Sequence, residues 1–93
     1  MEQLYEQIKS LAKKHHAQKV VLFGSRARGD NHQCSDIDLA IYDMPEPNQA
    51  LFSLDIEDLP TLLKFDLVYI TPFTNPKLIE NINKEGVVLY EKL

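Results

Sequence analysis

Residues 20–41 read VVLFGSRARGDNHQCSDIDLAI, and this stretch decides the fold. It opens with the apolar run Val20–Phe23, which is short, uninterrupted and typical of a buried strand, and we predict this first strand over residues 19–23. The run breaks at Gly24 and Ser25, as a tight turn requires. A second strand is predicted over residues 35–42, where apolar residues alternate with others. The stretch therefore predicts two strands joined by a glycine-containing turn and a polar loop.

The second strand carries two carboxylates, where an ordinary strand would carry neither. Asp36 and Asp38 are two residues apart, so both side chains point to the same face of the strand. Two like charges on one face repel, and a divalent cation between them removes that repulsion. Carboxylate oxygens suit Mg²⁺, and they also suit Mn²⁺. The pattern predicts a metal site, and the alternative is an exposed strand edge with ordinary surface acids.

The turn between the strands supplies a complementary feature. Backbone N–H groups of a tight turn after a buried strand, together with the Ser25 hydroxyl, can bind a phosphate. Arg26 and Arg28 add positive charge beside this turn. A phosphate-binding turn next to a pair of metal-binding carboxylates is the arrangement that phosphoryl or nucleotidyl transfer requires.

These motifs resemble a known family. The signature of the DNA polymerase-β-type nucleotidyltransferase superfamily is similar to a pattern in this sequence, in which Gly24-Ser25 is followed after ten residues by Asp36-x-Asp38. The sequence Gly-Ser-Arg-Ala-Arg-Gly resembles the smallest branch of that superfamily, the minimal nucleotidyltransferases of prokaryotes. The resemblance implies a third carboxylate from a later strand, and Asp66 is the match. It implies that ATP is the substrate and that Mg²⁺ or Mn²⁺ is the metal. The implied catalytic and metal-binding residues are Asp36, Asp38 and Asp66, and the implied nucleotide-binding residues are Gly24, Ser25, Arg26 and Arg28.

The third carboxylate lies in another predicted strand, residues 65–71. Alternation places Asp66 on the opposite face from Phe65, Leu67 and Tyr69. An unpaired carboxylate is costly to bury, and metal coordination shared with the other two carboxylates would compensate for that cost. The alternative is an edge-strand residue that faces water.

The rest of the chain predicts helices around these strands. We expect a helix over residues 2–16, a short helix capped by Asn48 and ended by Pro60, a helix capped by Asn75 and followed by Gly86, and a final edge strand over residues 87–90. The expected fold class is α/β (α+β), with a single mixed β-sheet flanked by helices in one domain, residues 1–93. The resemblance implies the polymerase-β-like nucleotidyltransferase fold.

Several polar residues are predicted to have structural or solvent-exposed roles. His15 and His16 end the first helix and point in different directions, which makes them a poor metal pair. His32 and Cys34 lie in a polar loop, where we expect a solvated histidine and an ordinary cysteine rather than a phosphate contact and a reactive thiol. In the short helix after Asn48, we expect Leu51, Phe52, Ile56 and Leu59 to be apolar contacts and Asp55, Glu57 and Asp58 to be solvated.

Charge and composition narrow the substrate class. The net charge is −4, and no Lys or Arg occurs between Arg28 and Lys64. This charge distribution argues against long nucleic acids as substrates and is compatible with a small nucleotide bound as its metal complex.

The sequence also bears on the cellular location. No run has the length of a membrane span, and the first residues lack a signal-peptide pattern. A single cysteine fits a reducing cytoplasm. We therefore expect a cytoplasmic protein with no membrane partner.

The resemblance also implies a partner. Larger relatives carry a helical domain that binds the nucleotide base and the acceptor. The 93 residues of this sequence leave none for such a domain. We therefore expect a hetero-oligomer in which a partner completes an open site. Minimal nucleotidyltransferases often pair with a HEPN-domain toxin as antitoxins of the type VII class, and they silence the toxin by transferring AMP to a tyrosine hydroxyl. Three alternatives remain: a non-catalytic nucleotide-binding or toxin-sequestering subunit, an enzyme that modifies a small molecule such as an aminoglycoside, and an RNA-tailing enzyme.

Overall fold

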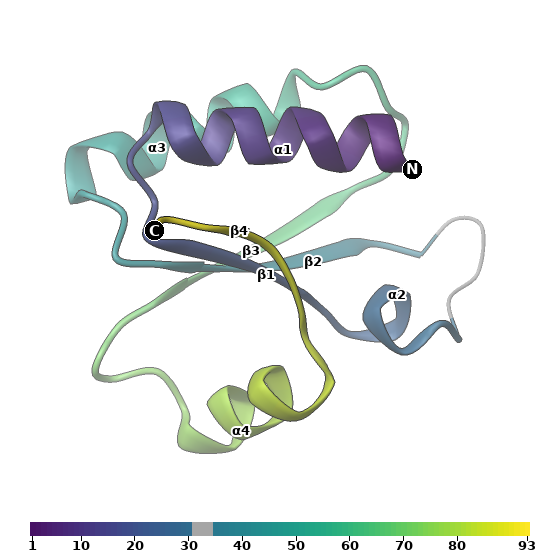
Figure 1. Ribbon diagram of the computed structural model, residues 1–93, viewed down its shortest axis with the longest axis vertical. Coiled ribbons are helices and arrows are strands. Elements are labelled where there is room, and N and C mark those ends of the chain that lie inside the picture. The colour runs from purple at the N-terminus through teal and green to yellow at the C-terminus, as the bar shows by residue number, and fades with distance from the viewer. Residues whose placement is uncertain (31–34) are drawn as a thin grey trace.

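The computed structural model describes residues 1–30 and 35–93, so the expectations for His32 and Cys34 lie outside the described residues. Within those ranges, four strands form one sheet in the order β3-β2-β1-β4, and four helices accompany it (Figure 1). The elements are α1 (Glu2–Lys14), β1 (Lys19–Phe23), α2 (Ser25–Arg28), β2 (Ile37–Tyr42), α3 (Glu46–Glu57), β3 (Phe65–Ile70), α4 (Pro76–Glu85) and β4 (Val87–Glu91).

The sheet is mixed, as the sequence predicts. Strand β1 pairs antiparallel with β2 and with β4, whereas β2 pairs parallel with β3. A parallel pair needs a crossover connection, which α3 provides between β2 and β3. The predicted first strand has the observed bounds, and the predicted last strand does lie at the sheet edge. The expected α+β class with a single mixed sheet is confirmed.

Helices cover the two faces of the sheet unequally. Helices α1 and α3 lie on one face and α4 lies on the other (Figure 1). Alternate residues of the two central strands therefore point into different cores. The larger core includes Ile8, Val20, Leu22, Ile37, Leu39, Ile41, Phe52 and Ile56, and the smaller one contains Val21, Ala40 and Ile82. Asp38 has the parity of Ala40, so it belongs to the face that α4 covers.

Helix α3 differs from the expectation at two residues. It begins at Glu46 and has Pro45 as its N-cap, so the prediction that Asn48 caps it was wrong. The Asn48 amide instead donates to the backbone carbonyl of His15, 3.0 Å away, where α1 ends. Leu51 was expected among the apolar contacts, yet it is 55% exposed. Phe52 lies on the buried face, as expected. Leu51 is the preceding residue, so it is rotated by about 100° around the helix and points away from the core.

His15 is a buried structural residue that joins α1 to α3. Its Nε2 lies 2.7 Å from Oδ2 of Asp55, and its ring meets the Phe52 ring edge-on with 5.9 Å between centroids. Lys14 also reaches the Asp55 carboxylate, at 3.5 Å. The expectation that Asp55 is merely solvated was wrong, because its acceptor role depends on a residue 40 positions away in the sequence.

Helix α4 has both predicted ends, because Asn75 caps it and Gly86 follows it. The Asn75 side chain accepts a hydrogen bond from the Lys77 backbone N–H at 2.9 Å, which confirms the predicted cap. Gly86 is extended, with φ −71°, and does not adopt the left-handed conformation typical of a glycine after a helix. A Cβ at Gly86 would collide with the Ile82 carbonyl and with a methyl group of Val21. Glycine is therefore needed here for close packing against β1.

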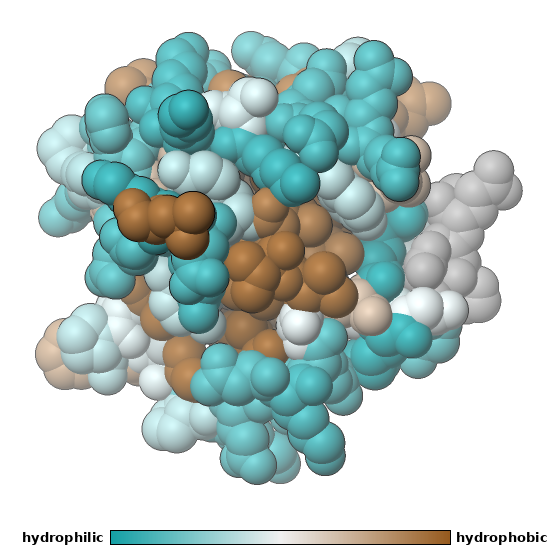
Figure 2. Space-filling view, in the orientation of Figure 1, coloured by the Kyte–Doolittle hydropathy of each residue, from teal (hydrophilic) through white to brown (hydrophobic). Residues whose placement is uncertain are grey.

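The edge strand β4 carries apolar surface. Val87 and Val88 are 47% and 51% exposed. Figure 2 shows apolar surface in the centre of the view, over β4, with polar surface from α1 above it and from α4 below it. Among the described residues, no helix combines the length and apolar character needed to cross a membrane.

Candidate active site

The turn after β1 passes directly against a carboxylate. Gly24 has φ 77°, a left-handed conformation that side chains disfavour. A Cβ built on Gly24 would collide with Oδ2 of Asp38. The chain then forms the single helical turn α2, which ends at Gly29 with φ 84°. The predicted tight turn is therefore a one-turn helix, and only glycine at position 24 permits this approach to Asp38.

Asp38 lies on an inner strand, between β1 and β3. The register pairs Asp38 with Phe23 of β1 on one side and with Asp66 of β3 on the other. Residues directly opposite in neighbouring strands point to the same face, so the Asp38 and Asp66 carboxylates lie on one face of the sheet. Asp36 lies just before β2 and is exposed. The parallel β2–β3 pair thus brings together two predicted site residues that are distant in the sequence.

The electrostatics of Asp38 reflect this crowding. Burial raises the pKa of the Asp38 carboxyl, and the negative charges of Asp66 and Asp36 raise it further. The Arg28 guanidinium acts in the opposite direction and lowers the pKa of Asp38. The three carboxylates therefore repel one another, and the charge that Arg28 provides does not fully offset that repulsion.

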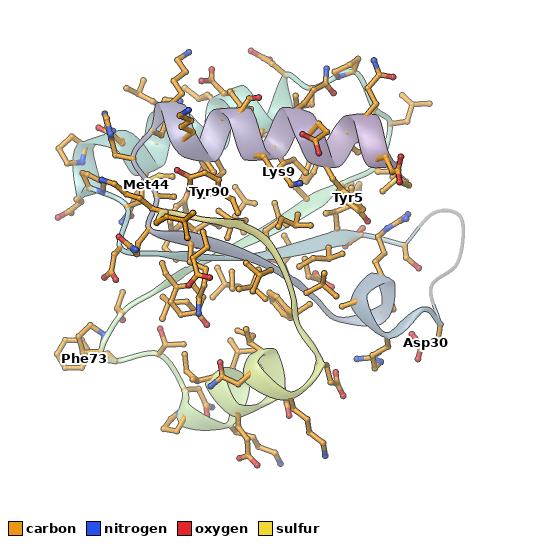
Figure 3. The ribbon with its side chains drawn as sticks, in the orientation of Figure 1. Tyr5, Lys9, Asp30, Met44, Phe73 and Tyr90 are labelled. Atoms are coloured by element: carbon orange, nitrogen blue, oxygen red, sulfur yellow. The ribbon has the colours of Figure 1, made fainter. Side chains whose placement is uncertain are left out.

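Arg28 is held in place by two carboxylates. Its Nη1 donates to Oε2 of Glu85 at 3.0 Å, and its Nε donates to Oδ2 of Asp30 at 3.2 Å. These contacts raise the pKa of Arg28, with the hydrogen bond to Glu85 as the largest cause. Asp30 lies directly after α2, at the end of the molecule remote from Phe73 (Figure 3). Sequence reasoning missed Glu85, which lies 57 residues from Arg28 and carries no local signal.

Arg26 has a different set of contacts. Its Nε and Nη2 both donate to the backbone carbonyl of Ser35, at 3.0 and 2.9 Å. Ser35 directly precedes Asp36, so Arg26 fixes the chain where it enters the carboxylate-bearing strand. Ser25, the first residue of α2, is half-buried, and its carbonyl accepts backbone hydrogen bonds from Gly29 and Asp30.

A family model matches most of this chain. Residues 6–93 match the model for polymerase beta, nucleotidyltransferase. The chain belongs to this nucleotidyltransferase family. No curated protein matches the sequence of this nucleotidyltransferase.

Solved structures of toxin–antitoxin pairs share the fold. A chain of a toxin–antitoxin complex with AMP-PNP is 22% identical, with a TM-score of 0.68 over 95% of this chain and 73% of that one. A mutant of the toxin–antitoxin pair MntA-HpeT is 20% identical, with the same TM-score of 0.68 and coverage of 95% and 73%. A complex of a tri-AMPylated Shewanella oneidensis HEPN toxin with an MNT antitoxin gives 18% identity and a TM-score of 0.68, over 98% and 72%.

The carboxylates of the nucleotidyltransferase suit a hard divalent cation. All three are oxygen donors, and burial together with the charges of Asp66 and Asp36 raises the pKa of Asp38, so a bound cation would favour its ionised form. Within residues 1–30 and 35–93, no three His, Cys, Asp or Glu side chains converge closely enough to hold a metal ion as they stand. Asp36 and Asp66 are exposed, and exposed side chains change rotamer within nanoseconds. The donor chemistry fits a divalent metal, although these carboxylates do not form a complete metal site in the observed rotamers.

Proposed function

We propose that this nucleotidyltransferase transfers AMP from ATP to a tyrosine hydroxyl of a HEPN-domain toxin and acts as the antitoxin of a type VII toxin–antitoxin pair. The observation that carries the chemistry is the Gly24 turn packed against Asp38, which shares a face and a register position with Asp66. The similar structures support the choice of acceptor, because one contains AMP-PNP and another contains an AMPylated HEPN toxin. The single cysteine favours a cytoplasmic location.

The three carboxylates have distinct roles in this proposal. Asp36 and Asp38 bind the Mg²⁺ or Mn²⁺ that accompanies the triphosphate, and Asp66 contributes to metal binding from the neighbouring strand. A divalent cation, when bound, supplies charge stabilisation to the attacking and leaving oxygens of an in-line displacement. Asp66 also accepts the proton of the incoming hydroxyl, because it is the exposed member of the in-register pair.

The turn and its arginines bind the nucleotide phosphates. The backbone at Gly24 and the Ser25 hydroxyl hold the β- and γ-phosphates, and Arg28 offsets the charge that develops on them. Arg26 contributes by holding the Ser35 carbonyl and thereby the start of β2. The tyrosine oxygen attacks the α-phosphorus, the bond from that phosphorus to the bridging oxygen breaks, and pyrophosphate leaves with that oxygen.

The test uses ATP labelled on the α-phosphate. The wild-type protein and an Asp36→Ala, Asp38→Ala double variant are each incubated with Mg²⁺, labelled ATP and the HEPN-domain protein of the same cells. We expect label on a tyrosine of the HEPN protein with the wild type alone, because the double variant lacks two of the three carboxylates. Circular dichroism spectra and melting temperatures of both proteins show whether the variant is folded.

Other outcomes would replace this proposal. Label on RNA or on a small molecule would retain the chemistry and overturn the acceptor. Nucleotide binding without any transfer would favour the non-catalytic subunit, an alternative consistent with the absence of a converged carboxylate trio among the described residues.

A further inference from the structure

Helix α3 is apolar on its outer side as well as on its buried side. Phe52 and Ile56 are fully buried against the sheet. Another set of apolar residues faces away from the sheet, and we call it the outer stripe. The outer stripe consists of Pro47, Ala50, Leu51 and Leu54, all exposed. Residues three, four and seven positions apart share one side of a helix, so these four side chains form a continuous strip.

The other two long helices have a different outer surface. The exposed residues of α1 are all polar: Glu2, Gln3, Glu6, Ser10, Lys13 and Lys14. Beyond its first residue, α4 is also polar wherever it is exposed. Leu51 and Leu54, in contrast, are 55% and 58% exposed. A helix that is apolar on opposite sides is normally covered on both, so the outer stripe indicates a partner.

The charges around the outer stripe define the partner's surface. Exposed carboxylates stand at both ends of α3, Glu46 at the start and Glu57 and Asp58 at the end. Lys64 lines a hollow with Glu57 and Lys14 pairs with Asp55, but α3 itself contains no Lys or Arg. A complementary surface therefore has an apolar centre flanked by Lys or Arg side chains.

The same charges argue against a second copy of this chain. In a two-fold symmetric contact, each outer stripe would face its own equivalent. The Glu46, Glu57 and Asp58 carboxylates would then meet no Lys or Arg of α3, because this helix has none. Like charges placed opposite each other in an interface repel and select against that pairing.

The C-terminal end of α3, beyond the outer stripe, lies next to the strand that carries Asp66. Helix α3 runs back from the end of β2 to the start of β3, and Glu57 and Phe65 line one surface hollow. Phe65 directly precedes Asp66, and β3 is an edge strand. A protein seated on α3 can therefore reach the carboxylates around the open edge of the sheet.

We propose that the outer stripe is the docking surface for the acceptor protein, which presents an apolar patch flanked by basic side chains. This inference rests on the proposed function, because the acceptor is the HEPN-domain toxin. Docking on α3 would hold the toxin against one side of the sheet while its tyrosine enters the site on the other side.

The experiment measures binding of the HEPN-domain protein to three forms of the full chain. A Leu51→Glu, Leu54→Glu double variant places charges on the outer stripe, and we expect Kd to rise by about a hundredfold or more. Phe73→Glu is the matched control, because Phe73 is 95% exposed in the β3–α4 connection, away from α3 (Figure 3). We expect the control to bind within about twofold of the wild type. AMP-PNP binding and melting temperature should agree among all three forms.

A second pair of measurements tests the charge argument. Glu57→Lys combined with Asp58→Lys reverses one end of the rim, so association with the HEPN protein should slow and lose much of its salt dependence. Equal binding of the wild type and the Leu51→Glu, Leu54→Glu variant would overturn the docking surface, even if AMP transfer to the toxin is found. A wild-type dimer that this variant dissociates would assign the outer stripe to a second copy and would also overturn it.

The remaining outcomes separate this inference from the proposed function. A complex that depends on the outer stripe but transfers no AMP would support the docking surface and overturn the enzymatic role. Absence of any complex between the wild-type chain and the HEPN protein would overturn both.

Discussion

Asp38 and Asp55 are both half-buried carboxylates, and their surroundings have opposite effects. Burial, Asp66 and Asp36 raise the pKa of Asp38. The hydrogen bond from His15, with further help from Lys14, lowers the pKa of Asp55. The chain therefore supplies a histidine hydrogen bond and a lysine to the carboxylate that joins two helices. It supplies further carboxylates to the one at the glycine turn, which leaves that site suited to a cation from outside the chain.

The largest effect is expected from Asp38→Asn, which removes a proposed metal ligand and one of the repelling charges. AMP transfer should fall by about a thousandfold. The folded protein should nevertheless become more stable at neutral pH. The pKa of Asp38 is raised on folding, so the stability of the wild type decreases as pH rises from the unfolded to the folded pKa of this group. The asparagine side chain of the variant does not ionise, so the variant does not lose this stability.

Urea unfolding of Asp38→Asn and wild type at several pH values tests the second half of this prediction. The advantage of the variant should be absent in acid and should appear as pH rises above the ordinary range of an aspartate. A variant less stable than the wild type at pH 7 would contradict the view that burial and like-charged neighbours destabilise the ionised Asp38 carboxylate.

Gly24→Ala should have the next largest effect, because the new methyl group would displace the Asp38 carboxylate. We expect AMP transfer to fall by about a hundredfold and the free energy of unfolding to fall by about 1–2 kcal/mol. Gly29→Ala is the matched control, since Gly29 has φ 84° but has nothing within 4 Å of a built Cβ. The control should lose similar stability and retain most of its activity. Equal activity losses in both variants would attribute the effect to backbone strain alone.

Arg26→Lys tests how the start of β2 is held. A lysine provides a single ammonium in place of the two guanidinium donors that bind the Ser35 carbonyl, so Asp36 should be less well positioned. We expect kcat/KM for AMP transfer to fall by about tenfold. Lys9→Ala, which removes an exposed pair with Glu6, should leave the rate unchanged. An unaltered rate in Arg26→Lys would remove Arg26 from the site.

Asp55→Asn should change activity least, by less than about twofold, because Asp55 lies on the other face of the sheet from Asp38. It should lower stability at neutral pH. The pKa of Asp55 is lowered on folding, so its contribution is present above the unfolded pKa and is lost as pH falls through the folded one. The two proteins should therefore converge in stability in acid. A constant difference across the pH range would show that the lost contact is not ionic.

Local patterns predicted the elements and the faces well. The bounds of β1, the cap at Asn75 and the side of β3 that Asp66 occupies all follow from residues within a few positions of one another. Predictions failed where distant residues decide the outcome. The Asn48 side chain binds the carbonyl of His15, which lies 33 positions away, instead of capping its own helix.

The same reasoning explains the gaps in the predicted site. The motif indicated which carboxylates to examine, because i and i+2 residues of a strand share a face. It gave no signal that Glu85 holds Arg28, a contact across 57 positions. Gly86 was correctly predicted to follow helix α4, but the pattern gave no signal that a glycine there leaves room for Val21. Contacts of this kind are set by tertiary packing, which residue patterns do not encode.

The pairing of β1 with β4 has a consequence for biosynthesis. Strand β1 leads into the Gly24 turn, and its second neighbour is β4, after which the Lys92 N–H donates to the Gln18 carbonyl at 2.9 Å. A ribosome adds about 5–20 residues per second, so β1 waits several seconds for that neighbour. Throughout this time the nascent strand Lys19–Phe23 has one edge with unpaired N–H and C=O groups. An open edge of this kind can pair with a chaperone or with another nascent chain. Nascent chains that stop before Val87 keep that edge open permanently.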